Sequence, residues 1–224
     1  MPLADIILID KPAGLTSFGV VARVRRVLSQ TAGHRVKVGH TGTLDPFATG
    51  LLILLSGSAT KQSNHFLKLD KSYEATLFLG ATSTTGDPEG EIVSSSNDFK
   101  PTLTQIQQVV AAFQGTIQQT VPAFSAVKIN GQRAYKLARR GQDFTPPTRT
   151  VQIYQLDILF YQFPILKINC QVSSGTYIRT LAEDLGAKLG TGAYLTALRR
   201  TQIGNYHLRD AVSLSEFLDT FPEK

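Results

Sequence analysis

The chain has 224 residues, of which 42% are hydrophobic and 18% charged, and 23 Lys and Arg against 17 Asp and Glu give it a net charge of +6. This composition can fill a core and excludes collagen-like, coiled-coil and low-complexity chains. The sequence lacks an apolar run of about 18 residues, and Cys170 is the single cysteine. A membrane span, a secretory signal, a disulfide framework and a metal site are therefore not expected, and we expect a cytoplasmic protein.

Strands are predicted where apolar residues form short runs or alternate with polar ones. These segments are residues 6–9, 36–38, 51–55, 72–79, 126–129, 151–160 and 165–172. A tight turn at Asn130-Gly131 follows the fifth of them.

Helices are predicted where apolar residues recur every three or four positions. The first helix runs from Ser17, as its cap, to Gly33. The others span residues 58–67, 104–113, 135–140, 177–189 and 213–218. Gly115 is expected to end the helix at 104–113. Strands and helices interleave without a regular βαβ repeat, which favours a single α+β domain over a doubly wound sheet.

Positive charge is concentrated in two segments. Residues 23–37 hold five bases and no acid, and residues 122–150 hold six bases and one acid, so each segment carries +5. Such clustering indicates a polyanionic partner such as nucleic acid. On charge alone, a solvated helix face with a basic loop explains the pattern equally well.

A glycine-rich loop at residues 39–50 holds a candidate catalytic acid. It reads Gly-His-Thr-Gly-Thr-Leu-Asp-Pro-Phe-Ala-Thr-Gly, and Pro46 restricts Asp45 to extended backbone geometry. An aspartate that caps a turn is the alternative reading. A second segment, residues 174–180, holds Arg179, which could keep a buried carboxylate ionised or simply face solvent at a helix start.

Other enzyme classes receive little support from the sequence. It contains no Gly-x-Ser-x-Gly elbow, no phosphate-binding P-loop and no Gly-x-Gly-x-x-Gly dinucleotide loop. A serine hydrolase, an NTPase and a dehydrogenase are therefore not expected.

The chain resembles the TruB family of tRNA pseudouridine synthases, which isomerise uridine-55 in the T-loop. The resemblance is carried in family order and spacing by residues 10–17, 39–50, 71–75, 122–128 and 175–186, with Arg199-Arg200 as a late basic pair. It implies the α+β pseudouridine-synthase fold, a curved, mixed and mainly antiparallel sheet with flanking helices and a central cleft. It also implies that no cofactor is needed, because the reaction adds and removes nothing.

The same resemblance assigns site residues. Asp45 matches the catalytic aspartate, Arg179 the arginine that pairs with it, and Tyr73 the tyrosine that stacks on the uracil. His40, Tyr177 and Leu198 match residues that contact the flipped base or line its pocket. Basic residues of the matched motifs and of the RNA-gripping "thumb" at about residues 122–150 are expected to bind RNA: Lys11, Lys128, Arg133, Arg139, Arg140 and Arg199.

The resemblance also shapes the expected partner. Typical bacterial members continue into a C-terminal PUA domain, whereas this sequence ends at Lys224. We therefore expect it to bind tRNA mainly through the T-arm. We also expect a monomer. A non-catalytic tRNA-binding or tRNA-folding protein, and a synthase acting on another RNA, are the alternatives.

Overall fold

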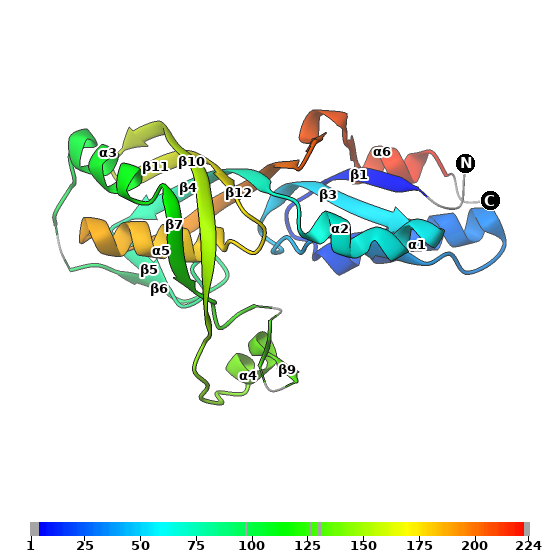
Figure 1. Ribbon diagram of the computed structural model, residues 1–224, viewed down its shortest axis with the longest axis horizontal. Helices are drawn as coiled ribbons and strands as arrows, with labels where there is room; N and C mark the ends of the chain where they lie inside the picture. The colour runs from blue at the N-terminus through cyan, green and yellow to red at the C-terminus, as the bar shows by residue number, and fades with distance from the viewer. Residues whose placement is uncertain (1–4, 97, 126, 130, 222–224) are drawn as a thin grey trace. The chain divides into compact units, whose positions relative to one another are not determined.

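The structure is a computed structural model that describes residues 5–221 except 97, 126 and 130. Its backbone divides into two compact units (Figure 1): residues 5–74 with 198–221, and residues 75–197. Two strands, β4 (Lys71–Leu79) and β12 (Ala193–Ile203), have residues in both units. The single-domain organisation expected from the sequence stays a prediction.

The first unit contains strands that pair around β3. Its strand order is β14-β1-β3-β12, with β2 also paired to β3 and β13 to β12. The pairs of β1 with β14 and of β12 with β3 are parallel, and the other three are antiparallel. The strands are β1 (Ile6–Lys11), β2 (Val38–His40), β3 (Thr49–Ser56), β13 (Tyr206–His207) and β14 (Val212–Ser213). The helices are α1 (Ser17–Ala32), η1 (Gly57–Gln62), α2 (Ser63–Leu67), η2 (Leu208–Asp210) and α6 (Leu214–Asp219).

Strand β3 is buried along nearly its whole length because both of its faces are covered. One face, with Leu52 and Leu54, packs against α1 and α6. The other face, with Leu51 and Ile53, packs against η1 and Phe66 of α2. This two-sided cover explains why the sequence reads here as a continuous apolar run rather than an alternating one.

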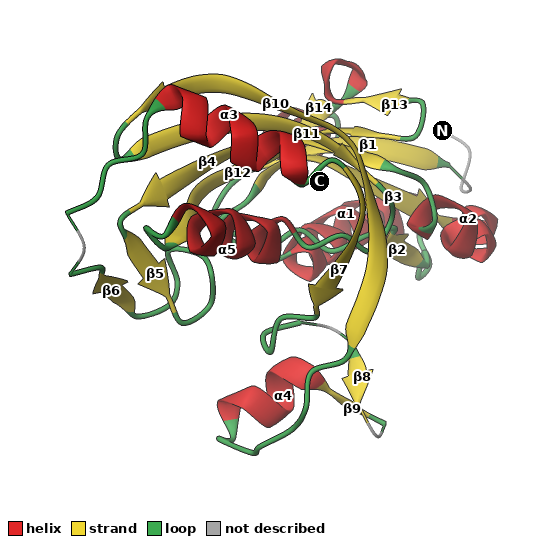
Figure 2. Ribbon diagram, turned by 60° about the vertical axis from the view of Figure 1, so that its left-hand side comes forward, coloured by secondary structure: helices red, strands yellow, loops and turns green. Residues whose placement is uncertain are grey.

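The second unit contains the strand order β12-β4-β11-β10-β7. Strand β10 pairs with both β7 and β11 in antiparallel orientation. Helices α3 and α5 contact each other and the sheet, α3 at β10 and α5 at β7 (Figure 2). The elements are β5 (Ala81–Ser83), β6 (Ile92–Ser94), α3 (Leu103–Ala112), β7 (Gly115–Thr120), β8 (Lys128–Ile129), β9 (Gln132–Arg133), α4 (Ala134–Arg139), β10 (Thr148–Gln162), β11 (Ile165–Val172) and α5 (Ile178–Leu189).

The α+β class and the mainly antiparallel sheet are confirmed, and the cleft stays a prediction. The helix cap is Thr16 rather than Ser17, because the Thr16 hydroxyl accepts from the Gly19 amide. Gly115 starts β7 and does not end α3, whose C-cap is Phe113. The predicted helix at 58–67 is a 3-10 turn followed by α2. Ala126 and Asn130, which the predicted strand and turn include, lie outside the described residues.

Two further expectations concern membranes and metals. None of the helices within the described residues is both long and apolar enough to cross a membrane. Across the same part of the chain, no group of three or more His, Cys, Asp or Glu side chains is placed to hold a metal ion.

Candidate active site

The loop that carries Asp45 joins β2 to β3 in the first unit, and its backbone is fixed on both sides of the aspartate. On one side, the Leu44 amide donates to the Ser17 hydroxyl (2.8 Å), which in turn donates to the Leu44 carbonyl (3.0 Å). On the other, the Pro46 carbonyl accepts from the Gly14 amide at 2.8 Å. The segment at residues 10–17 therefore acts as a brace for the residues on either side of Asp45.

Lys11 is a buried part of this brace. Its ammonium group donates to the carbonyls of Pro12 (2.8 Å), Leu15 (2.7 Å) and Pro46 (3.3 Å), and the residue is 0% exposed. These bonds give Lys11 a positioning role for the loop. Its predicted contact with RNA stays a prediction.

Arg200 of β12 joins the two ends of the same loop. Its Nη2 donates to the Gly42 carbonyl (3.2 Å) and its Nε to the Leu51 carbonyl (2.8 Å), while the residue is only 1% exposed. Gly50 makes this approach possible: it adopts φ +101°, and a Cβ there would lie 2.3 Å from the Arg200 carbonyl oxygen. The close contact of β3 with β12 therefore requires glycine at this position.

The buried guanidinium group of Arg200 affects two neighbouring basic groups. Burial, and secondarily Arg200, lowers the pKa of His40. Burial also lowers the pKa of Lys71 to about 8, with Arg200 adding to the decrease and Asp70 opposing it. The buried positive charge of Arg200 thus disfavours the protonated forms of these two neighbouring side chains.

The other predicted residues of the first unit lie on β4 and β12. Tyr73 and Leu198 are each 7% exposed. Tyr73 alternates with exposed Glu74 along β4, as the sequence pattern predicts. Arg199 pairs with Asp10 at 2.7 Å and also donates to the Thr49 hydroxyl at 3.3 Å.

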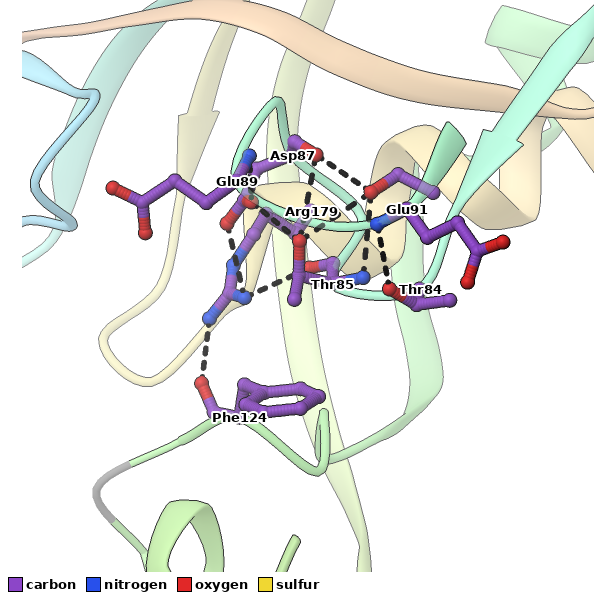
Figure 3. A network of polar contacts seen from close by, with 8 residues as sticks. Thr84, Thr85, Asp87, Glu89, Glu91, Phe124 and Arg179 are labelled. Atoms are coloured by element: carbon purple, nitrogen blue, oxygen red, sulfur yellow. Dashed lines mark hydrogen bonds and ion pairs between the residues drawn. The ribbon is translucent and has the colours of Figure 1, made fainter. Parts of the chain in front are cut away.

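Arg179, in the first turn of α5, is the centre of a buried polar network in the second unit (Figure 3). It forms an ion pair with Asp87 at 3.3 Å, and the two side chains are 7% and 3% exposed. It also donates to the carbonyls of Thr85 and Phe124, both at 2.8 Å. Removing one partner of such a buried pair costs about 3–5 kcal/mol, because the other charge is left uncompensated.

The loop that carries Asp87 is itself closely held. The Asp87 carboxylate accepts from the Thr85 hydroxyl (2.5 Å) and the Glu89 amide (3.0 Å). At Gly86, which has φ +72°, a Cβ would lie 2.7 Å from a carboxylate oxygen of Glu183. Burial raises the pKa of Glu183, and Arg179 partly opposes this increase.

Tyr177 is fixed by two neighbours. The buried side-chain amide of Gln119 accepts from the Tyr177 amide (3.0 Å) and donates to its carbonyl (3.2 Å). The Arg149 guanidinium lies 5.5 Å from the centre of the tyrosine ring. Tyr177 therefore occupies the N-cap of α5 with a defined backbone position, two residues before Arg179.

The predicted thumb residues share one small structure between β7 and β10. Lys128 of β8 is opposite Arg133 of β9, and the hairpin leads directly into α4. The four predicted bases, Lys128, Arg133, Arg139 and Arg140, are all exposed, as is Lys136 of α4. Like charges directly opposite each other on a strand pair repel.

The structure therefore groups the predicted residues by unit. Asp45, Tyr73, His40, Lys11, Leu198 and Arg199 belong to the first unit, whereas Arg179, Tyr177 and the four thumb bases belong to the second. The pairing of Asp45 with Arg179 stays a prediction. Sequence reasoning missed Asp87, Gln119 and the positioning role of Arg200, since each depends on contacts between distant segments.

Comparison with known proteins gives matches over most of the chain. Residues 25–178 match the model of the TruB family pseudouridylate synthase N-terminal domain, and residues 179–223 match that of the tRNA pseudouridylate synthase B C-terminal domain. A tRNA pseudouridine synthase B of Mycobacterium sp. (strain KMS) is 46% identical over 218 residues, which cover 96% of this chain and 72% of the relative. The protein of that name from Bordetella avium is 44% identical over 95% of this chain and 86% of the relative.

Solved structures show the same fold. A chain of a Cbf5-Nop10-Gar1 complex superposes with a TM-score of 0.73 at 28% identity, over 97% of this chain and 54% of that one. A chain of an H/ACA RNP bound to a substrate RNA containing 2′-deoxyuridine gives a TM-score of 0.71 at 26% identity over 97% of this chain. This chain spans only about half of the length of each. The family models and the bacterial relatives show that the chain belongs to the TruB family of pseudouridylate synthases.

Proposed function

We propose that this tRNA pseudouridine synthase converts uridine 55 in the T-loop of tRNA to pseudouridine, with Asp45 as its catalytic carboxylate. The observation that carries the proposal is the loop braced on both sides of Asp45 by Ser17 and Gly14. A catalytic group must be held within a fraction of an ångström of its working position, and this brace supplies such rigidity.

The reaction needs few chemical groups. The N1–C1′ bond of uridine breaks, the detached uracil rotates, and a C5–C1′ bond forms. C5 loses its proton and N1 gains one, so the composition of the nucleoside does not change. Positive charge that develops on the sugar favours a nearby carboxylate, the role we assign to Asp45. Tyr73 would stack on the uracil, and Arg179 would keep the carboxylate ionised; both roles are parts of the proposal.

The RNA must also be bound and its target base exposed. Flipping a base out of its stack costs a few kcal/mol. The exposed Lys and Arg side chains of the β8–β9 hairpin and α4 can offset this cost by binding phosphates of the RNA. His40, Tyr177, Leu198, Lys11 and Arg199 complete the proposed RNA-binding set. We further propose a monomer that acts in the cytoplasm on the T-arm.

The proposal is tested by tritium release from T-arm RNA labelled at C5 of uridine, because C5 loses its hydrogen when the new bond forms. The unaltered protein should release tritium, and Asp45→Asn should not, although it still binds the RNA in a gel-shift assay. Asp219→Asn, at an exposed carboxylate on α6, is the matched control and should remain active.

Other outcomes separate the alternatives. Binding without any release by the unaltered protein would identify a non-catalytic tRNA-binding protein. Release from another cellular RNA but not from the T-arm would change the substrate. Near-full activity of Asp45→Asn would overturn the catalytic assignment.

A further inference from the structure

A second basic surface, distinct from the thumb, follows helix α1. Between Asp10 and Asp45 the sequence has six basic residues and no acidic one. Five of them lie on α1 or directly after it, and four of these are exposed: Arg23, Arg26, Arg35 and Lys37. The chemistry proposed above uses none of these five side chains.

An aromatic ring stands at the start of this surface. Phe18, in the first turn of α1, is 61% exposed. The face of α1 that packs into the core is formed by other residues: Val20, Val21 and Val24. The ring of Phe18 is therefore not needed to complete the core.

The exposed ring lies beneath a guanidinium. The Arg25 side chain is 5.7 Å from the centre of the Phe18 ring. Residues seven positions apart lie on the same side of a helix, two turns apart. Phe18, Arg25 and the exposed guanidinium groups beside them thus combine a flat aromatic surface with local positive charge.

We propose that this surface, formed by Phe18, Arg25 and Arg26, binds an unpaired nucleobase and its phosphates in the RNA substrate, apart from the target uridine. The base would stack on the open part of the Phe18 ring, and the guanidinium groups would contact the adjoining phosphates. This combination of a stacking aromatic with basic side chains is the one that binds unpaired nucleotides without regard to sequence. An acidic protein segment would use the charge but not the ring. The inference rests on the proposed function in that it takes RNA as the substrate.

The absence of tryptophan from the sequence permits a direct test. Phe18→Trp introduces a single tryptophan, whose fluorescence is quenched when a base stacks on it. The matched control is Val93→Trp, at a side chain that is 55% exposed on β6 beside exposed Glu91. Titration with T-arm hairpin RNA and with a full tRNA transcript should quench the first variant and leave the second unchanged.

The two RNAs locate the base. Quenching by both would assign the stacked base to the T-arm, and quenching by the full transcript alone would assign it to another part of tRNA. Equal quenching by polyglutamate would overturn the assignment to a nucleobase. If neither RNA quenched the fluorescence of Phe18→Trp, the proposal would be overturned.

Affinity measurements test the energetic role. Phe18→Ala should raise the Kd for the RNA that quenches by about tenfold, the scale of one base stack, with an unchanged melting temperature. Arg26→Gln should reduce the slope of log Kd against log salt concentration by about 1, the value expected for the loss of one phosphate contact. An unchanged Kd in Phe18→Ala would contradict this inference, but it would not contradict the proposed function, which tritium release by the unaltered protein tests separately. Quenching without any tritium release from the unaltered protein would instead contradict the proposed function alone.

Discussion

Replacing Arg200 with methionine tests whether one buried guanidinium holds the Asp45 loop in place. The substitution removes two charge-assisted hydrogen bonds, to the carbonyls of Gly42 and Leu51. Each is worth about 1.5–3 kcal/mol. Relief of the cost of burying the charge offsets part of this loss. We therefore expect the free energy of unfolding to fall by about 3 kcal/mol, which lowers Tm by about 6–12 °C in a chain of this size.

The same change should impair catalysis more than binding. Gly42 lies three residues before Asp45, and a displacement of about 1 Å at a catalytic group can cost about a hundredfold in rate. Single-turnover tritium release should therefore fall by about that factor under saturating T-arm RNA, with a much smaller change in Kd. Arg200→Lys keeps the charge but not both hydrogen bonds, so it should recover only part of the rate.

A neighbouring arginine provides the control for stability. The Arg199 side chain is 41% exposed and pairs with a partly exposed Asp10, and such pairs contribute about 0–1 kcal/mol. Calorimetry should therefore show a much smaller loss of Tm for Arg199→Met than for Arg200→Met. Equal losses in the two variants, or an Arg200→Met protein with unchanged Tm and rate, would refute the reasoning.

Two further predictions concern the other buried charges. Asp87→Ala should cost about 3–5 kcal/mol of stability and reduce tritium release, because Arg179 loses its ion pair with Asp87. Glu91→Gln, at an exposed side chain of the same loop, should change neither the melting temperature nor the release of tritium. Lys71 has a pKa of about 8 when folded against 10.5 ordinarily, so between these pH values the unfolded chain holds more protons and stability rises with pH. Thermal melts across this range should show the rise in the unaltered protein relative to Lys71→Met, and a parallel pH dependence of the two would contradict the assigned cause.

Local patterns in the sequence predict the elements whose burial is regular. The apolar run at Leu51–Leu55 and the alternation at Ser72–Leu79 correspond to β3 and β4. Strand β12 was not predicted, because Arg199 to Gln202 interrupt any alternation with four polar residues. Its strand conformation depends on pairing with β3 and β4, which are distant in sequence.

The site was predictable to a similar extent. Asp45 lies in a glycine-rich loop directly before a proline, and this local pattern is recognisable from the sequence alone. Asp87 lies in a segment that the sequence identifies only as a loop, and its ion pair with Arg179 joins residues 92 positions apart. Arg200 resembles any surface arginine in the sequence, since only its burial distinguishes it from Arg199.

The two buried guanidinium groups differ in what balances their charge. Arg179 has the carboxylate of Asp87, whereas the hydrogen bonds that Arg200 makes within the described residues go only to backbone carbonyls. Carbonyl dipoles orient a charge but do not cancel it, which is why Arg200 contributes to the lowered pKa values of both His40 and Lys71. The same positive potential stabilises any negative charge near the loop, whether the ionised carboxylate of Asp45 or a phosphate of bound RNA. A buried arginine that has no acidic partner among the described residues is costly for folding alone, and the catalytic role proposed for the Asp45 loop would account for that cost.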